Sequence, residues 1–212
     1  MSDLCPFCNW QTQDILEETR NFCLITDLYP LIEGHSLIIP KTHRRCIGEI
    51  PPEEQAEFLA LWIYAKSQLE QIYGWVSNWE NGGIRQAIKH AHLHLLPIGT
   101  QKTMELPAKM WQSGRIVRLD GWSALFEWHK TNGFYQLFQA GGDEPLHILR
   151  PSATWTKKKM DEADWVRVRQ MGMWNFIKAR IIRKNGLQMR QKFKTKWQLE
   201  SCKGEEQNRA SR

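Results

Sequence analysis

Apolar and polar positions follow two different periods along the first hundred residues. Residues 22–26 and 36–39 are short β-prone runs separated by Pro30 and Gly34, a pattern that predicts a hairpin. After Pro51, apolar residues recur near a helical period as far as Gly74, and acidic residues occupy the expected first turn. Two further strands are predicted at 75–79 and 88–96, on either side of a turn at 81–83.

The second half of the chain has a different pattern of apolar residues. Residues 122–128 are compatible with a helix, and 134–139 and 146–149 predict a hairpin around a glycine-rich turn. From Asp161 to Ile181 apolar residues recur near a helical period, whereas 188–212 contain few of them. We therefore expect an α+β domain at 1–106, with an antiparallel sheet and one main helix, a smaller basic extension at 107–187, and a poorly ordered basic tail at 188–212.

Charge is distributed unevenly between the two halves. Residues 1–110 contain 9 basic and 13 acidic residues, and residues 111–212 contain 20 and 10, which together give the net charge of +6. The basic half also carries seven of the 11 tryptophans, so it is a candidate to bind nucleic acid. Tryptophans at helical spacing are more often part of a core, and the Lys and Arg residues are equally compatible with a solvated face.

Composition also narrows the function classes. No apolar run reaches the length of about 18 to 20 residues that a membrane span needs, and no leader precedes Cys5, so we expect a cytoplasmic protein without membrane contact. No Walker pattern or magnesium-binding loop is present, which argues against kinase or NTPase chemistry.

Three histidines at every second position are the strongest chemical signal in the chain. In an extended segment His90, His92 and His94 would share one face, while Ala91 and Leu93 would point into a core. Imidazole is able to act as a nucleophile or proton carrier near neutral pH. The alternative interpretation is a half-buried strand that carries histidines without a catalytic role.

A pair of cysteines near the start, Cys5-Pro6-Phe7-Cys8, is a second signal. In a reducing compartment this spacing is typical of metal binding or of a redox pair rather than of a structural disulfide.

With these motifs, the first hundred residues resemble the histidine triad (HIT) family of nucleotide hydrolases and transferases. The resemblance is carried by four segments in order: Cys5-Pro6-Phe7-Cys8, the run from Gly34 to His43, Pro52-Glu53-Glu54, and the run from His90 to Leu96. It implies the α+β fold, a homodimer, and attack of His92 on the α-phosphorus of a nucleotide derivative. The substrates it suggests are diadenosine polyphosphates and nucleoside phosphoramidates. It also implies that His94 contacts the phosphate oxygens, with His35 beside it.

The resemblance further implies structural zinc bound by Cys5, Cys8, His43 and His90, a set that would close a tetrahedral shell. A reduced, metal-free pair or a redox pair of cysteines is the alternative.

Two polar residues are candidate nucleotide ligands by the same resemblance. Asp27 would bond the ribose hydroxyls, and its alternative role is that of a turn residue. Gln86 would bond a phosphate oxygen, and its alternative is an exposed loop residue. The chain departs from the family pattern at Ala87, where a hydroxyl is usual, and at Ile84-Arg85, which interrupt a Gly-Gly-Gln sequence.

Two other functions remain open from the sequence. In the first, a deadenylase removes adenylate from nucleic-acid ends and the basic C-terminal region binds the strand. In the second, a zinc-stabilised module binds nucleotides without turnover.

Overall fold

The structure is a computed structural model that describes residues 5–9, 14–84, 86–99, 116–141, 144–150 and 179–210, with side chains described for 186–203 of the last segment. The strands are β1 (Ile15–Glu18), β2 (Phe22–Thr26), β3 (Ser36–Pro40), β4 (Trp75–Glu80), β5 (Leu93–Gly99), β6 (Ile116–Leu119), β7 (Gln136–Gln139) and β8 (Leu146–Leu149). The helices are the 3-10 turn η2 (Ile47–Glu49) and the α-helices α1 (Pro52–Tyr73), α3 (Trp122–Asn132) and α5 (Ala179–Ala210).

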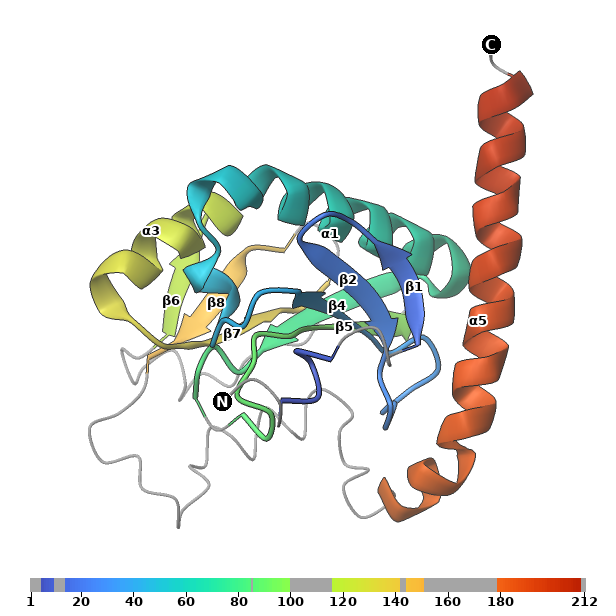
Figure 1. The fold of residues 1–212 in the computed structure, drawn as a ribbon, viewed down its shortest axis with the longest axis horizontal. Helices are drawn as coiled ribbons and strands as arrows, with labels where there is room; N and C mark the ends of the chain where they lie inside the picture. The colour runs from blue at the N-terminus through green and yellow to red at the C-terminus, as the bar shows by residue number, and fades with distance from the viewer. Residues whose placement is uncertain are drawn as a thin grey trace.

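All the described strands belong to one antiparallel sheet with the order β1-β2-β3-β5-β4-β7-β8-β6. The predicted α+β class is confirmed. Both predicted hairpins, β2–β3 and β7–β8, pair in register. Strands β1 and β6 were not predicted from the sequence. Each is four residues long, and they lie at the two edges of the sheet. Figure 1 shows α1 and α3 along the same side of the sheet.

Helix α1 confirms the main predicted helix. Pro52 stands in its first turn, where a missing backbone N–H costs nothing, and Gly74 ends it with a positive φ of 89°. Its buried face consists of Phe58, Leu61, Ala65 and Leu69, spaced three or four residues apart. This face packs with apolar residues of β2, β4 and β5 in the main core.

The predicted histidine strand is partly wrong. Strand β5 begins only at Leu93, so His90 and His92 lie in the segment before the strand and not in the strand itself. The cause is a backbone hydrogen bond of 2.6 Å from the N–H of Ala91 to the carbonyl of Arg44, which ties this segment to the 41–45 loop instead of to a neighbouring strand.

The predicted extension continues the sheet of the first half. Strand β7 pairs with β4, and Asn78 donates a 2.5 Å hydrogen bond to the side chain of Gln139 across this seam. Ser77 donates a further bond of 2.7 Å to the carbonyl of Gln139. The proposed division between residues 106 and 107 lies outside the described residues. Helix α3 confirms the helix predicted at 122–128.

The expectation of a disordered tail is wrong for residues 188–210, which belong to α5. The few apolar residues of this segment recur with helical spacing, and Phe193 and Trp197 are buried in the main core. The start of the long helix predicted from Asp161 lies outside the described residues. In Figure 1, α5 lies beside α1 and its C-terminal part extends beyond the rest of the molecule. Among the described helices, none has the length and hydropathy that a membrane span requires.

Candidate active site and metal centre

Two predicted site histidines meet where β3 and β5 pair. His35 directly precedes β3, and His94 is the second residue of β5, opposite Leu37. Nε2 of His35 lies 2.9 Å from Nδ1 of His94, and the two rings stack with centroids 5.1 Å apart. Antiparallel pairing therefore brings together two residues separated by 59 positions.

The proton positions in this pair follow from one backbone donor. The N–H of Leu31 donates a 3.2 Å hydrogen bond to Nδ1 of His35, so this nitrogen carries no proton. Burial, with a smaller effect of nearby His92, lowers the pKa of His35 to about 3, so its ring is neutral. Its proton must then sit on Nε2 and be donated to Nδ1 of His94. A neutral His94 consequently carries its own proton on Nε2.

His92 takes the opposite tautomer. Its Nδ1 lies 2.6 Å from the backbone carbonyl of His90, which is only able to accept, so Nδ1 carries the proton and Nε2 keeps a lone pair. Burial lowers the pKa of His92, although the carbonyl of His90 and the charge of Asp27 act in the opposite direction. The rings of His92 and His94 are neighbours, with centroids 4.9 Å apart. The hydrogen-bond partners thus leave a lone pair on Nε2 of His92 and put the proton of a neutral His94 on its Nε2, an arrangement suited to attack on a phosphate.

Aromatic side chains enclose these rings. Phe7, which is 6 % exposed, contacts His92 edge-on with centroids 5.4 Å apart. Trp79 of β4 lies against His94 at 5.5 Å. These contacts restrict the rotation of the two imidazoles. Neither residue was predicted from the sequence to belong to the site. Phe7 stands inside the cysteine motif, but Trp79 gave no signal, because only strand pairing brings it beside His94.

Asp27 fulfils the turn role that the sequence left open. Its Oδ1 accepts a 2.6 Å bond from the N–H of Tyr29, and its Oδ2 lies 3.5 Å from Nε2 of His35. The carboxylate therefore stands at the edge of the histidine pair, and its ribose contact stays a prediction.

Gln86 is tied to the neighbouring loop. Its amide donates a 2.8 Å bond to the carbonyl of Arg45, so its predicted phosphate contact would have to use the remaining capacity of the amide group. Ala87 and Lys89 are exposed, and Arg85 lies outside the described residues.

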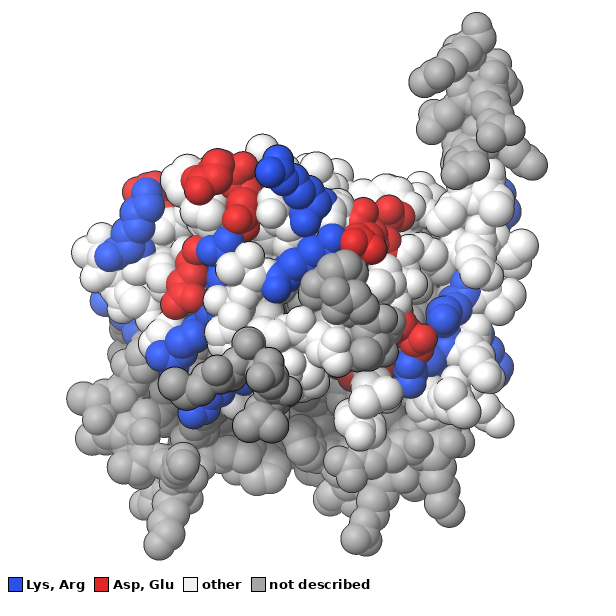
Figure 2. Space-filling model, in the orientation of Figure 1, with Lys and Arg blue, Asp and Glu red and all other residues white. Residues whose placement is uncertain are grey.

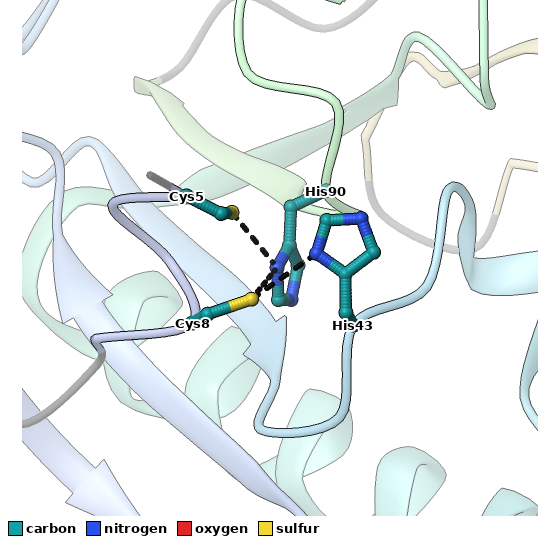
Figure 3. A group of neighbouring side chains, drawn as sticks. All are labelled: Cys5, Cys8, His43 and His90. Carbon is teal, nitrogen blue, oxygen red and sulfur yellow. Dashed lines mark hydrogen bonds between the residues drawn. The ribbon is translucent and has the colours of Figure 1, made fainter. Parts of the chain in front are cut away.

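The four predicted metal ligands form a second cluster next to the histidine pair. Cys5 and Cys8 come from the N-terminal loop, His43 from the loop after β3, and His90 from the segment before β5. Their ligand atoms all lie within 4.8 Å of one another, and Figure 3 shows the side chains pointing toward a common centre.

The spacing of these atoms agrees with a tetrahedral zinc shell. With zinc bonds of about 2.3 Å to sulfur and about 2.0 Å to nitrogen, a sulfur and a nitrogen ligand lie about 3.5 Å apart. Nδ1 of His90 lies 3.4 Å from Sγ of Cys5 and 3.6 Å from Sγ of Cys8, and Nδ1 of His43 lies 3.1 Å from Sγ of Cys8.

The hydrogen bond at Nε2 of His90 favours metal binding through Nδ1. Its Nε2 lies 2.8 Å from the carbonyl of Pro40, which fixes the proton there and leaves the lone pair of Nδ1 directed at the sulfurs. Burial lowers the pKa of His90 to about 4, against the effect of the Pro40 carbonyl, so the ring stays neutral as metal binding requires.

The part of the chain that contains these residues is similar to known proteins. The HIT domain family matches residues 10–101. Adenosine 5'-monophosphoramidase HNT1 of Saccharomyces cerevisiae is 33 % identical over 126 residues, which cover 57 % of this chain and 70 % of that protein. Adenosine 5'-monophosphoramidase hnt1 of Schizosaccharomyces pombe is 32 % identical over 99 residues, covering 44 % and 73 %.

Among solved structures, a Zn-bound histidine triad family protein from Mycobacterium smegmatis is 26 % identical, with a TM-score of 0.40 over 60 % of this chain and 94 % of that one. The matched segment contains all three histidines of the HXHXH motif together with His35, and the identity to both yeast proteins exceeds 30 % over more than two thirds of their length. The chain therefore belongs to the HIT domain family.

Proposed function

We propose that the protein is a nucleotide hydrolase or nucleotidyl transferase that acts at the α-phosphate of a nucleotide derivative and forms a transient nucleotidyl-His92. The proposal rests on the hydrogen-bond partners of the two neighbouring rings, which assign them opposite tautomers. His92 keeps the lone pair of Nε2, and the neighbouring neutral His94 carries its proton on Nε2.

In the first step Nε2 of His92 forms a bond to phosphorus while the bond to the leaving group breaks. The imidazole becomes cationic, and the hydrogen bond from its Nδ1–H to the carbonyl of His90 stabilises this charge. His94 donates to a phosphate oxygen, and the buried His35 keeps it in the donating tautomer. Water, or another acceptor, then displaces the nucleotide from His92.

The substrate class is proposed from the relatives and from the loop beside His35. Both yeast proteins are named adenosine 5'-monophosphoramidases, which supports an adenosine phosphoramidate as the first substrate to test. Diadenosine polyphosphates present the same α-phosphate and are the second. Asp27 would bond the ribose hydroxyls and Gln86 a phosphate oxygen.

Zinc is proposed as a structural ion held by Cys5, Cys8, His43 and His90. Four protein ligands complete a tetrahedral shell, so the ion would supply rigidity rather than an open position for water or substrate. Its place is beside the catalytic segment, because His90 lies two residues from His92.

The test uses both candidate substrates, labelled at the α-phosphate, with the purified full chain and with His92→Ala. Lys203→Ala is the matched control, since Lys203 is exposed on α5 and pairs within that helix with Glu200. We expect release of AMP by the wild type and the control, and a loss of at least about a thousandfold in His92→Ala. An alkaline quench should retain label on the wild-type protein, because a phosphorus–nitrogen bond survives base better than acid.

Turnover that persists in His92→Ala would contradict the proposed nucleophile. AMP binding by a wild type that turns over neither compound would favour the module without turnover. Release of AMP from adenylated oligonucleotides alone would favour the deadenylase. The homodimer stays a prediction, which light scattering on the purified chain would test.

A further inference from the structure

Helix α5 contacts the loop that connects β2 to β3, residues 27–35, and the residues that flank it. The helix lies outside the segment matched by the HIT domain family, whereas the loop lies inside it. An added Cβ at Gly186 would stand 3.5 Å from Cδ of Pro30, which places the helix directly beside the middle of the loop. Figure 2 shows basic and acidic side chains next to each other where α5 meets the rest of the molecule.

Glu33 is the central contact of this seam. Its Oε1 accepts a 2.6 Å hydrogen bond from Nζ of Lys196 on α5 and one of 3.0 Å from the hydroxyl of Tyr73, the last residue of α1. Partial burial opposes ionisation of Glu33, but these bonds hold its pKa below the usual value. The ammonium of Lys196 also lies 4.9 Å from the centre of the Tyr73 ring.

Tyr73 connects this contact to His35. Phe193 of α5 packs on Tyr73 with ring centroids 6.1 Å apart. Tyr73 also lies so close to Gly34 that an added Cβ there would stand 2.7 Å from the ring. Gly34 precedes His35, so α5 supports the residue next to a proposed site histidine.

A second set of contacts holds the start of the loop. Arg190 of α5 forms an ion pair with Asp14 and donates a 3.3 Å bond to the hydroxyl of Thr26, the residue before Asp27. Lys194 adds an ion pair of 3.3 Å with the same Asp14. Side chains of α5 thus bind Thr26, just before the loop, and Glu33 within it, and Gly186 lies near Pro30 between them.

We propose that α5 is a positioning element that holds the β2–β3 loop in the conformation that binds the nucleoside monophosphate part of the substrate. The proposal rests on the proposed function, because the loop carries Asp27, the proposed ribose ligand, and Leu31, whose N–H sets the tautomer of His35. None of these α5 contacts involves His92 or His94, which belong to the 90–95 segment, so α5 acts on the reacting groups only indirectly, through Leu31 and His35.

Loss of the α5 contacts should therefore change substrate binding, measured as KM, more than the chemical step, measured as kcat. Removing a half-exposed ion pair of this kind changes a binding constant by about two- to fivefold. Lys196→Ala should therefore raise KM for adenosine phosphoramidate by about that factor and leave kcat within about twofold. The double variant Arg190→Ala/Lys196→Ala should raise KM by about tenfold, since it releases the loop at both ends.

The experiment combines kinetics with amide hydrogen exchange on the full chain. Peptides that cover 27–35 should exchange faster in Lys196→Ala and in the double variant, while peptides of β4 and β5 keep the wild-type rate. Lys196→Arg should restore both KM and exchange, and Lys203→Ala, on the same helix, should match the wild type. Glu33→Gln should add little to Lys196→Ala, because both variants remove the same pair.

Two results would overturn the proposal. The first is wild-type exchange of 27–35 in the double variant. The second is a fall in kcat at unchanged KM, which would place the effect of α5 on the chemical step. Hydrogen exchange of the loop requires no substrate, so a wild type without turnover would reject the proposed function while exchange still decides whether α5 holds the loop.

Discussion

His90 and His92 are joined by a 2.6 Å hydrogen bond from Nδ1–H of His92 to the backbone carbonyl of His90. The ring of the same His90 faces the sulfurs of Cys5 and Cys8. One residue therefore belongs to both sites: its side chain is a candidate metal ligand, and its carbonyl determines the tautomer of the proposed nucleophile. Whatever orders His90 also orders His92.

The first prediction concerns metal content. Cys8→Ser should reduce bound zinc from about one ion per chain to nearly none, because it removes one of four ligands. At free zinc about 100 times the dissociation constant, the lost binding lowers the free energy of unfolding by about 2.7 kcal/mol. Elemental analysis and chemical denaturation measure both quantities.

The matched control for this variant is Cys202→Ser, since Cys202 is an exposed cysteine on α5. Zinc that stays at one equivalent in Cys8→Ser, or that falls equally in the control, would reject the proposed ligand set.

The second prediction concerns Phe7, which connects the cysteine loop to His92, the proposed nucleophile. Phe7→Leu keeps an apolar side chain but removes the edge contact with His92, so the ring of His92 gains freedom. We expect kcat to fall by about tenfold, with a stability loss of about 1 kcal/mol and zinc content unchanged. An unchanged kcat in a zinc-loaded variant would show that Phe7 serves packing alone.

The third prediction is a dependence of stability on pH. The pKa of His35 is about 3 in the fold and about 6.5 in an unfolded chain, so between these values the unfolded state binds the additional proton. Stability is therefore lost as pH falls below about 6.5. From pH 7.5 to 5.5 the contribution of His35 is a loss of about 1.4 kcal/mol.

Urea denaturation of the wild type and His35→Gln at the two pH values isolates this contribution. The variant should lose about 1.4 kcal/mol less than the wild type between pH 7.5 and 5.5. Equal losses in both proteins would mean that His35 is not held neutral by burial.

The fourth prediction compares two glycines with positive φ. Gly34 has φ +87°, and a Cβ there would lie 2.7 Å from Tyr73 and 2.8 Å from Pro97. Gly133, at the end of α3, has φ +73° and nothing within 4 Å of an added Cβ. Gly133→Ala should cost about 1 kcal/mol for backbone strain alone, and Gly34→Ala about 3 kcal/mol because crowding is added.

Thermal unfolding of the two alanine variants tests this difference. Equal losses would mean that Tyr73 and Pro97 move aside at little cost, and would weaken the tight contact inferred between Tyr73 and the β2–β3 loop.

The local pattern of the chain was sufficient to predict α1, α3 and the hairpins β2–β3 and β7–β8. These elements depend on periodicity, caps and turns, which involve residues close to one another in the sequence. Such local patterns are visible in a single sequence. It was insufficient for residues 188–210, where two apolar residues, Phe193 and Trp197, are enough to bury one face of a helix once α1 offers a surface. Amphipathic helices gain most of their stability from such tertiary packing, so composition alone underestimated α5.

By itself the sequence identified the cysteine pair and the three alternating histidines as candidate site residues, and the resemblance to the HIT family added His35 and His43. Only the tertiary structure decided the protonation pattern of each histidine ring. The carbonyls of Pro40 and His90 and the N–H of Leu31 select which nitrogen of each imidazole carries the proton. Every residue has a backbone carbonyl and every residue except proline has an N–H, so no sequence pattern singles these groups out, and only the fold brings each one within hydrogen-bond distance of its ring.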